Sequence, residues 1–173
     1  MRPPWVERPA GFDGVELVVP RGAAFGSGEH ASTQAALRLL HRVWDAPRTF
    51  ADVGCGSGIL ALYAVARGCA HVSACDVEAP AVAAAAELLP RAVVRLGGPE
   101  VLDPVDGLVA NLTAAELHAA LPALLALWRR RAALVLSGMR SHEVDGVLAR
   151  LPAAPCARET VAPFTAIALR AMP

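Results

Sequence analysis

The stretch "FADVGCGSGILA", residues Phe50 to Ala61, joins a predicted strand to a predicted helix through three alternating glycines. The strand ends at Val53, glycines stand at positions 54, 56 and 58, and an apolar helical run begins at Ile59. Glycine is needed where the backbone turns tightly and lets a ligand lie directly against it. The alternating glycines therefore favour a ligand-binding turn over a plain strand-to-helix connection.

Strand-like and helical segments alternate beyond this turn. Predicted strands cover 48–53, 71–75, 92–96, 106–111 and 132–137, and predicted helices cover 58–67, 80–89 and 141–151. Thr113 and Glu116 form a capping box that opens another helix, which we expect Pro122 to break before a second helix runs to about Arg130. Segments 157–161 and 164–169 leave no room for a helix between them, so they predict an antiparallel hairpin. The pattern predicts an α/β fold: a mainly parallel sheet of seven strands, a C-terminal antiparallel hairpin and helices on both faces.

The composition limits the class of protein. The chain has 173 residues, 55% of them hydrophobic, which suits one globular domain. Its 16 basic and 16 acidic side chains balance, so no general attraction to a nucleic acid is expected. The cysteines, at positions 55, 69, 75 and 156, form no C-x-x-C pair and the histidines lack zinc-ligand spacing, so we expect no metal and a reducing compartment. Without a signal-peptide core or an apolar run near ~18 residues, the sequence predicts a soluble, cytoplasmic protein with no membrane partner.

Two ligand classes fit the glycine turn. Gly56, Gly58 and Ala61 satisfy the dinucleotide fingerprint G-x-G-x-x-[GA]. Asp52 argues against a dinucleotide, because a carboxylate there would repel a pyrophosphate. It would instead favour S-adenosylmethionine, which has no phosphate and carries an ammonium and a sulfonium. The pattern D-x-G-x-G-x-G resembles motif I of the class I S-adenosylmethionine-dependent methyltransferases.

Two polar residues end neighbouring predicted strands. Asp76 follows the glycine turn at about the ~20-residue separation of an acid that accepts hydrogen bonds from ribose hydroxyls. Its alternative role is a charge at a helix N-terminus. Asn111, in "VANLT", ends a strand expected beside the first one, at the switch point where ligands collect, and its amide can hold a substrate nitrogen. Asn111 could instead cap the next helix, but Thr113 already supplies that cap, so we favour a functional Asn111.

Five segments together resemble the PrmA family, the methyltransferases of ribosomal protein L11. They are "AFGSGEHAST" (24–33), "DVGCGSGILA" (52–61), "ACDVEAPAV" (74–82), "VANLT" (109–113) and "LVLSGM" (134–139). The match covers residues 15 to 170 approximately, with the motifs in order and similarly spaced. The resemblance implies a Rossmann-like class I methyltransferase fold that binds S-adenosylmethionine.

The resemblance also implies roles for individual residues. The expected cofactor contacts, including those from the glycine motif, are Thr33, Asp52, Gly54, Gly56, Gly58, Asp76 and Asn111. Glu29 and His30 would face the acceptor, and His30 is either a catalytic residue beside Asn111 or only a polar cap. Thr33 is expected to begin a covering helix whose core stripe is Ala36, Leu37, Leu40 and Val43. Ser27 and Ser32 replace family threonines and keep the hydroxyl groups.

Family members carry an N-terminal substrate-recognition domain, and this chain begins near the linker that follows it. We interpret residues 1–23 as a linker-like segment with one strand at 15–19, and residues 24–173 as the methyltransferase domain. A recognition domain supplies remote binding energy that positions a large substrate. We therefore expect this chain alone to methylate ribosomal protein L11 poorly, and to prefer a smaller acceptor or one delivered by a partner chain.

The predicted activity is methyl transfer to an amine of a protein, with a ribosomal protein as one candidate acceptor. Such a transfer is an in-line displacement that positioning and exclusion of water can accelerate without a metal. A small-molecule amine is the alternative acceptor. A non-catalytic cofactor-binding module, working with another chain, is the second class; the intact motifs argue against it. Asp52 and Asn111 argue against the third class, a nucleotide-dependent oxidoreductase.

Overall fold

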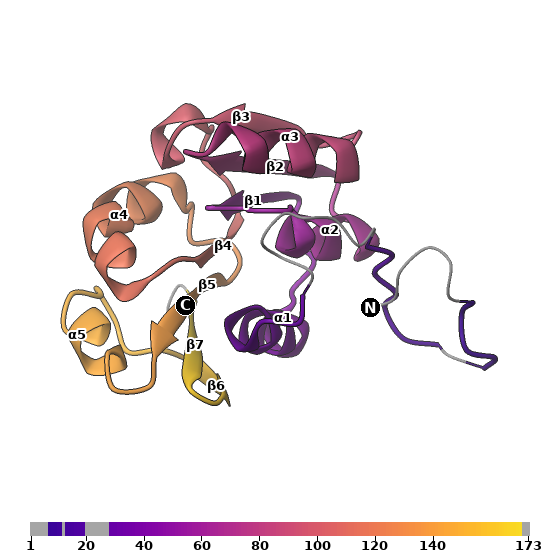
Figure 1. The fold of residues 1–173 in the computed structure, drawn as a ribbon. Coiled ribbons are helices and arrows are strands. Elements are labelled where there is room, and N and C mark those ends of the chain that lie inside the picture. The colour runs from indigo at the N-terminus through magenta and orange to yellow at the C-terminus, as the bar shows by residue number, and fades with distance from the viewer. Residues whose placement is uncertain (1–6, 12, 20–27, 171–173) are drawn as a thin grey trace.

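The computed structural model describes residues 7–11, 13–19 and 28–170. They form one seven-stranded sheet in the order β3-β2-β1-β4-β5-β7-β6 with helices on both faces (Figure 1). The strands are β1 (Thr49–Val53), β2 (His71–Asp76), β3 (Val93–Leu96), β4 (Gly107–Asn111), β5 (Leu134–Arg140), β6 (Ala157–Val161) and β7 (Phe164–Leu169). The helices are α1 (Ala31–Val43), α2 (Ile59–Ala66), α3 (Ala79–Leu88), the 3₁₀ turn η1 (Pro99–Val101), α4 (Ala114–Leu127) and α5 (Val144–Leu148).

The sheet has the predicted mixed character. Strands β3, β2, β1, β4 and β5 pair in parallel, whereas β7 runs antiparallel to both β5 and β6. The strand order reverses between β1 and β4, so the crevice at their carboxyl ends is the place where such sheets bind ligands. The predicted α/β fold and its C-terminal hairpin are confirmed.

Two hydrophobic clusters hold the layers together. Helices α1, α2 and α3 cover one face of the sheet, and α4 and α5 cover the other (Figure 1). Leu39, Leu40 and Phe50 are fully buried on the first face. Leu117 and Leu124 are fully buried on the second. Within the described ranges, no helix is both long and apolar enough to cross a bilayer.

Helix α4 corrects one prediction. Pro122 does not break it, and the helix runs without interruption from Ala114 to Leu127. A proline inside a helix costs about 3 kcal/mol, because it removes a hydrogen bond and crowds the preceding turn. The proline ring lies on the exposed side, while the leucines at positions 117, 121, 124 and 127 are buried at helical spacing on the other side. Burying a leucine contributes about 1.5–3 kcal/mol, so the apolar face outweighs the proline.

The N-terminal part of the described chain differs from two further predictions, on the start of helix α1 and on the strand at 15–19. Helix α1 begins at Ala31 and not at Thr33, and its buried face includes Leu39 and leaves Leu37 half-buried. The segment 15–19 is not a strand: it holds a single β-bridge at Val18. Its side chains at Leu17 and Val19 are nevertheless buried against the α1 and α2 side of the sheet. Ser27, and the start of the loop at 24–26, lie outside the described residues.

Candidate functional site

The glycine turn is fastened to the neighbouring strand. The backbone N–H groups of Gly54 and Cys55 both donate to the Cys75 carbonyl, at 2.9 and 3.1 Å. Gly54 has φ of 69°, and a Cβ on it would lie 2.2 Å from Cδ2 of Leu112. Gly56 also has positive φ, 52°. At both positions the backbone conformation favours glycine, and bare backbone borders the crevice.

Gly58 has a different role from the other two glycines. It caps the N-terminus of α2 with φ of 82°. A Cβ there would lie 2.8 Å from Cδ1 of Leu89 and 3.2 Å from Cβ of Ala85, so Gly58 allows close approach to α3. Gly58 lines neither of the two cavities described below, so its contact with a cofactor stays a prediction.

Asp52 lies behind the turn. Its carboxyl group is fully buried, and Oδ2 accepts a hydrogen bond from the backbone N–H of Ala61 at 2.9 Å. Gly58 has no side chain to cap α2, so Asp52 provides that cap from the strand. Burial is the main cause that raises the pKa of Asp52 to about 7; the Ala61 hydrogen bond opposes this rise, and the nearby charge of Asp76 adds to it. Oδ1 has no partner among the described residues, and direct contact with a cofactor stays a prediction.

Asp76 stands at the crevice, as its position at the end of β2 predicts. Its Oδ2 accepts from the backbone N–H of Gly56 at 2.9 Å, and its Oδ1 accepts from that of Glu78 at 3.0 Å. The carboxylate therefore connects the glycine turn to the start of α3, as the helix N-terminus alternative expects, and hydrogen bonds to ribose hydroxyls stay a prediction. Each oxygen keeps a further lone pair for a ligand hydroxyl.

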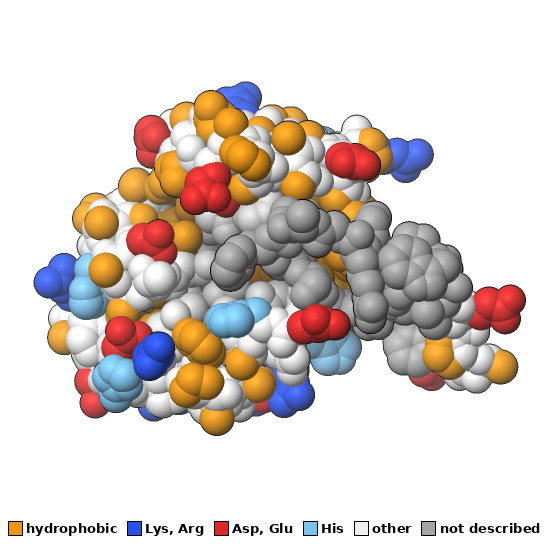
Figure 2. Space-filling model, in the orientation of Figure 1, with side chains coloured by type: hydrophobic (Ala, Val, Ile, Leu, Met, Phe, Trp, Pro, Cys, Tyr) orange, Lys and Arg blue, Asp and Glu red, His pale blue; other side chains and the backbone are white. Residues whose placement is uncertain are grey.

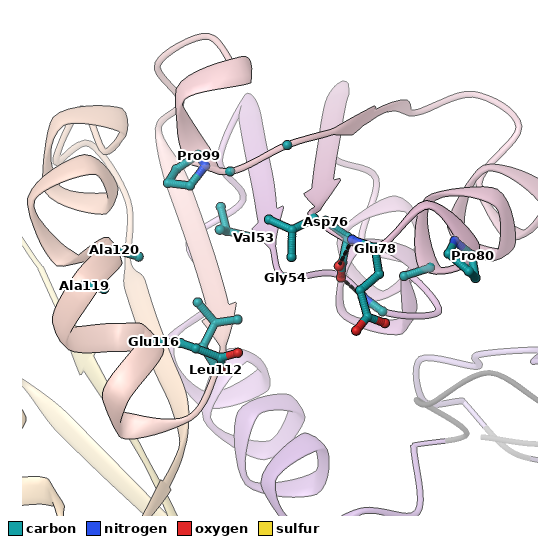
Figure 3. Close-up of a pocket in the computed structure, with 15 residues that line it drawn as sticks. Val53, Gly54, Asp76, Glu78, Pro80, Pro99, Leu112, Glu116, Ala119 and Ala120 are labelled. Carbon is teal, nitrogen blue, oxygen red and sulfur yellow. Dashed lines mark hydrogen bonds between the residues drawn. The ribbon is translucent and has the colours of Figure 1, made fainter.

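A first cavity of about 740 Å³ lies between the strand ends and α4, within the range of small-molecule sites. Figure 3 shows Val53, Pro99 and Leu112 pointing into it, with Asp76 at the glycine turn. The space-filling view is hollowed in this region, between α3 and α4 (Figure 2). The remaining lining residues are Gly54, Gly56, Val77, Glu78, Pro80, Ala81, Gly97, Gly98, Glu116, Ala119 and Ala120.

A second cavity of about 480 Å³ adjoins the first, since Gly54, Gly56, Leu112 and Glu116 line both. It brings together the start of α1, the ends of β4 and β5 and the start of β7. Its other lining residues are His30, Ser32, Thr33, Cys55, Ile59, Leu60, Asn111, Thr113, Gly138, Arg140, Glu143 and Phe164. The site is thus a pair of connected cavities that meet over the glycine turn.

Thr33 and Asn111 meet in the second cavity. The Nδ2 atom of Asn111 donates to Oγ1 of Thr33 at 3.3 Å, while Oδ1 of Asn111 is buried without a partner among the described residues. A buried amide oxygen without a partner costs about 1–3 kcal/mol and accepts any donor that enters. Thr113 and Glu116 form the predicted capping box, so α4 does not depend on Asn111 for its cap.

His30 has the capping role, one of the two that the sequence left open, and its catalytic role stays a prediction. It is the N-cap of α1, and its Nδ1 accepts from the backbone N–H of Ser32 at 3.4 Å. Its ring also lines the second cavity and packs on Phe164, with centroids 4.8 Å apart. Glu29 is exposed and lines neither cavity; its carbonyl accepts from the side chain of Gln34.

The thiols near the turn are protonated. Burial raises the pKa of Cys75 to about 12, and burial raises the pKa of Cys55 above its usual range as well. The carboxylates of Asp52 and Asp76 oppose thiolate formation at both positions. Neither cysteine is therefore a nucleophile at neutral pH.

Sequence reasoning missed the wall contributed by the C-terminal half of the chain. Arg140, Glu143 and Phe164 line the second cavity from β5, the turn after it and β7. Gly138 was within the quoted "LVLSGM" segment, and its φ of 94° brings the backbone so close to Leu112 that a Cβ would lie 2.2 Å from the Leu112 carbonyl oxygen. A glycine after a buried strand serine was the only local signal of this contact.

Comparison with known proteins agrees with the geometry. The family described as Ribosomal protein L11 methyltransferase (PrmA) matches residues 1–161. A ribosomal protein L11 methyltransferase of Dechloromonas aromatica is 36% identical over 151 residues, which are 85% of this chain and 51% of that protein. The chain thus spans about half the length of the curated relatives it matches.

Solved structures show the same architecture. The crystal structure of a ribosomal protein L11 methylase from Lactobacillus delbrueckii subsp. bulgaricus has a TM-score of 0.83 and 26% identity, covering 96% of this chain and 91% of that one. An RNA methyltransferase from Salinibacter ruber, solved in complex with S-adenosyl-L-homocysteine, has a TM-score of 0.59 and 15% identity. It covers 76% of this chain and 86% of that one, and shows the likeness of fold alone.

Proposed function

This chain belongs to the ribosomal protein L11 methyltransferase (PrmA) family, and from that membership we propose that it uses S-adenosylmethionine to methylate an amine of a protein. The observation that carries the proposal is the pair of cavities that meet over Gly54 and Gly56. One is bordered by the carboxylate of Asp76 and the other by the amide of Asn111. A donor and an acceptor can therefore reach the same glycine turn from two sides.

The first cavity fits a nucleoside. Asp76 presents carboxylate oxygens that accept hydrogen bonds from ribose hydroxyls. Val77 and Pro99 supply apolar surface on either side of the strand ends for a flat base. No basic side chain is among the described residues that line this cavity, which suits a ligand without phosphate. We propose Thr33, Gly54, Gly56, Asp76 and Asn111 as the residues that would hold the cofactor.

When bound, S-adenosylmethionine supplies a methyl group already activated by the sulfonium. The chain's own residues then need to exclude water and aim the acceptor. The free Oδ1 of Asn111 can accept a hydrogen bond from a neutral amine and direct its lone pair. His30 and Phe164 form the outer wall of the second cavity, where we propose that the acceptor enters.

Calorimetry and mass spectrometry test the proposal. We expect the chain to bind S-adenosylmethionine and S-adenosylhomocysteine but not NAD. Isotopically labelled cofactor, incubated with purified ribosomal protein L11 and separately with a cell lysate, should transfer label to a protein band at an amine. Tighter binding of NAD would overturn the cofactor assignment. Label confined to small molecules would favour the alternative acceptor class.

A further inference from the structure

Ser137 is a buried hydroxyl residue that lies outside both cavities. Its side chain is fully buried, in the middle of β5. A buried hydroxyl without a hydrogen bond costs free energy, and Ser137 avoids this cost because its Oγ donates to the carbonyl of Ser32 at 2.9 Å. The bond joins two residues 105 positions apart in the chain.

The Ser32 carbonyl does not depend on this bond for a partner. Ser32 lies in the first turn of α1, where each carbonyl accepts from the N–H four residues later. The hydroxyl of Ser137 adds a second donor to an oxygen that the helix already uses. Its consequence is therefore to fix the start of α1 against the sheet.

Ser137 also holds the opposite wall. It is the register partner of Asn111 in the parallel pairing of β4 with β5, and its carbonyl accepts from the backbone N–H of Leu112 at 3.0 Å. One residue therefore bonds to the first turn of α1 and to the end of β4. Those two elements carry Thr33 and Asn111, the polar pair of the second cavity.

The shape of β5 places Ser137 where it can bond to both α1 and β4. Val135 packs on the α1 side of the sheet and Leu136 on the α4 side, so alternation along the strand turns Ser137 toward α1. The pairing with β7 shifts register between Leu136 and Met139, and Met139 packs on the α4 side. An irregularity of this kind re-aims the residues that follow it, so Met139 does not return to the α1 side that Ser137 faces.

We propose that Ser137 is a positioning residue for methyl transfer, and that it acts through Ser32 by holding Thr33 in register with Asn111. This inference rests on the proposed function. Loss of the hydroxyl should loosen the start of α1 and misplace the acceptor wall, while the first cavity, whose lining does not include Ser137 or α1, continues to hold the nucleoside of the cofactor.

The test compares Ser137→Ala with Ser73→Ala. Ser73 is the matched control, because its Oγ also donates to a backbone carbonyl, that of Phe50, and it lines neither cavity. Three quantities are measured on the full chain: amide hydrogen exchange of residues 31–36, the dissociation constant of S-adenosylmethionine, and the rate of methyl transfer at saturating cofactor. The acceptor is ribosomal protein L11 or, if that transfer is too slow to measure, the lysate protein that takes the label. Asn111→Ala and the double variant Ser137→Ala/Asn111→Ala complete a double-mutant cycle for the methyl-transfer rate.

We expect Ser137→Ala to exchange faster at the start of α1 and to transfer methyl about tenfold more slowly at saturating cofactor. Its cofactor affinity should fall by no more than about fivefold, because Thr33 is only one of the proposed cofactor contacts. Ser73→Ala should match wild type in all three. On the Asn111→Ala background, Ser137→Ala should lower the methyl-transfer rate by less than about twofold, because both changes act on the contact between Thr33 and Asn111.

Two outcomes would overturn the inference: unchanged exchange at 31–36, or a tenfold loss of rate that persists undiminished on the Asn111→Ala background. A wild-type chain that binds no cofactor and transfers no methyl contradicts the proposed function instead. An active wild type with a Ser137→Ala variant identical to it in rate and exchange contradicts this inference alone.

Discussion

The side-chain amide of Asn111 donates to the hydroxyl of Thr33 at 3.3 Å and joins the end of β4 to the first turn of α1, 78 residues away in the chain. The two residues share the second cavity, and the amide oxygen of Asn111 is left without a partner among the described residues. The Nδ2 and Oδ1 atoms of this amide thus have different roles. The N–H group orients the side chain, and the oxygen is free for an incoming group.

Asn111→Ala should therefore reduce turnover much more than cofactor affinity. Misplacing a reacting group by about 1 Å can cost on the order of 100-fold in rate, so we expect a loss of that size in the methyl-transfer rate. Calorimetry with S-adenosylmethionine should show a change of only a few fold. Equal losses in rate and affinity would mean that Asn111 only shapes the cofactor pocket.

Asp76→Ala should weaken cofactor binding by about 1–3 kcal/mol, because hydrogen bonds to a charged acceptor are lost. The same change removes the bonds to Gly56 and Glu78, so the glycine turn loses its tie to α3. Titration calorimetry measures the affinity. Asp103→Asn, at an exposed position outside both cavities, is the control and should bind as wild type does. An unchanged affinity for Asp76→Ala would remove Asp76 from the site.

Asp52 makes stability depend on pH. Its pKa is raised to about 7 in the folded chain from an ordinary value of 3.8, so the folded state holds a proton that the unfolded state has released between these values. The stabilising effect of the protonated carboxyl is present below pH 4 and is lost as pH rises toward 7. Asp52→Asn keeps an oxygen for the Ala61 N–H and cannot ionise.

The free energy of unfolding of Asp52→Asn, relative to wild type, should therefore rise from pH 4 to pH 7 and level off above it. Urea denaturation across this range measures the difference. Asp103→Asn should show no such trend, because its side chain is exposed. If the difference in unfolding free energy between Asp52→Asn and wild type does not change with pH, the buried carboxyl has an ordinary pKa.

Gly58 and Gly68 lie at the two ends of α2, and both have positive φ, 82° and 79°. A Cβ at Gly68 meets no atom within 4 Å, so Gly68→Ala introduces only backbone strain and should lower the stability by about 1–2 kcal/mol. Gly58→Ala carries the same strain and also meets Leu89 at 2.8 Å, so its loss should be larger. Denaturant unfolding compares them. Equal losses would mean that α2 and α3 are not closely packed at Gly58.

Local patterns determined much of this fold. The glycine turn, the capping box of Thr113 with Glu116 and the hairpin of β6 with β7 each depend on neighbours in the chain, so their spacing could be read without tertiary contacts. The resemblance to the family then indicated which residues, from the strand ends and from the loop before α1, belong to one site. The structure brings four of them, Thr33, Gly54, Asp76 and Asn111, to the two connected cavities.

Tertiary packing decided the rest. Pro122 stays within α4 because the buried leucines on the opposite side outweigh the lost hydrogen bond, and burial is not visible in a local pattern. Alternation along β1 turns Asp52 toward α2 while Val53 faces the first cavity, so the acid of the glycine motif is a buried helix cap, a role that its position in the sequence did not indicate. Phe164 lines the second cavity and Ser137 reaches the Ser32 carbonyl only because β5, β7 and α1 are packed together, and contacts between such distant segments exist only once the sheet has formed.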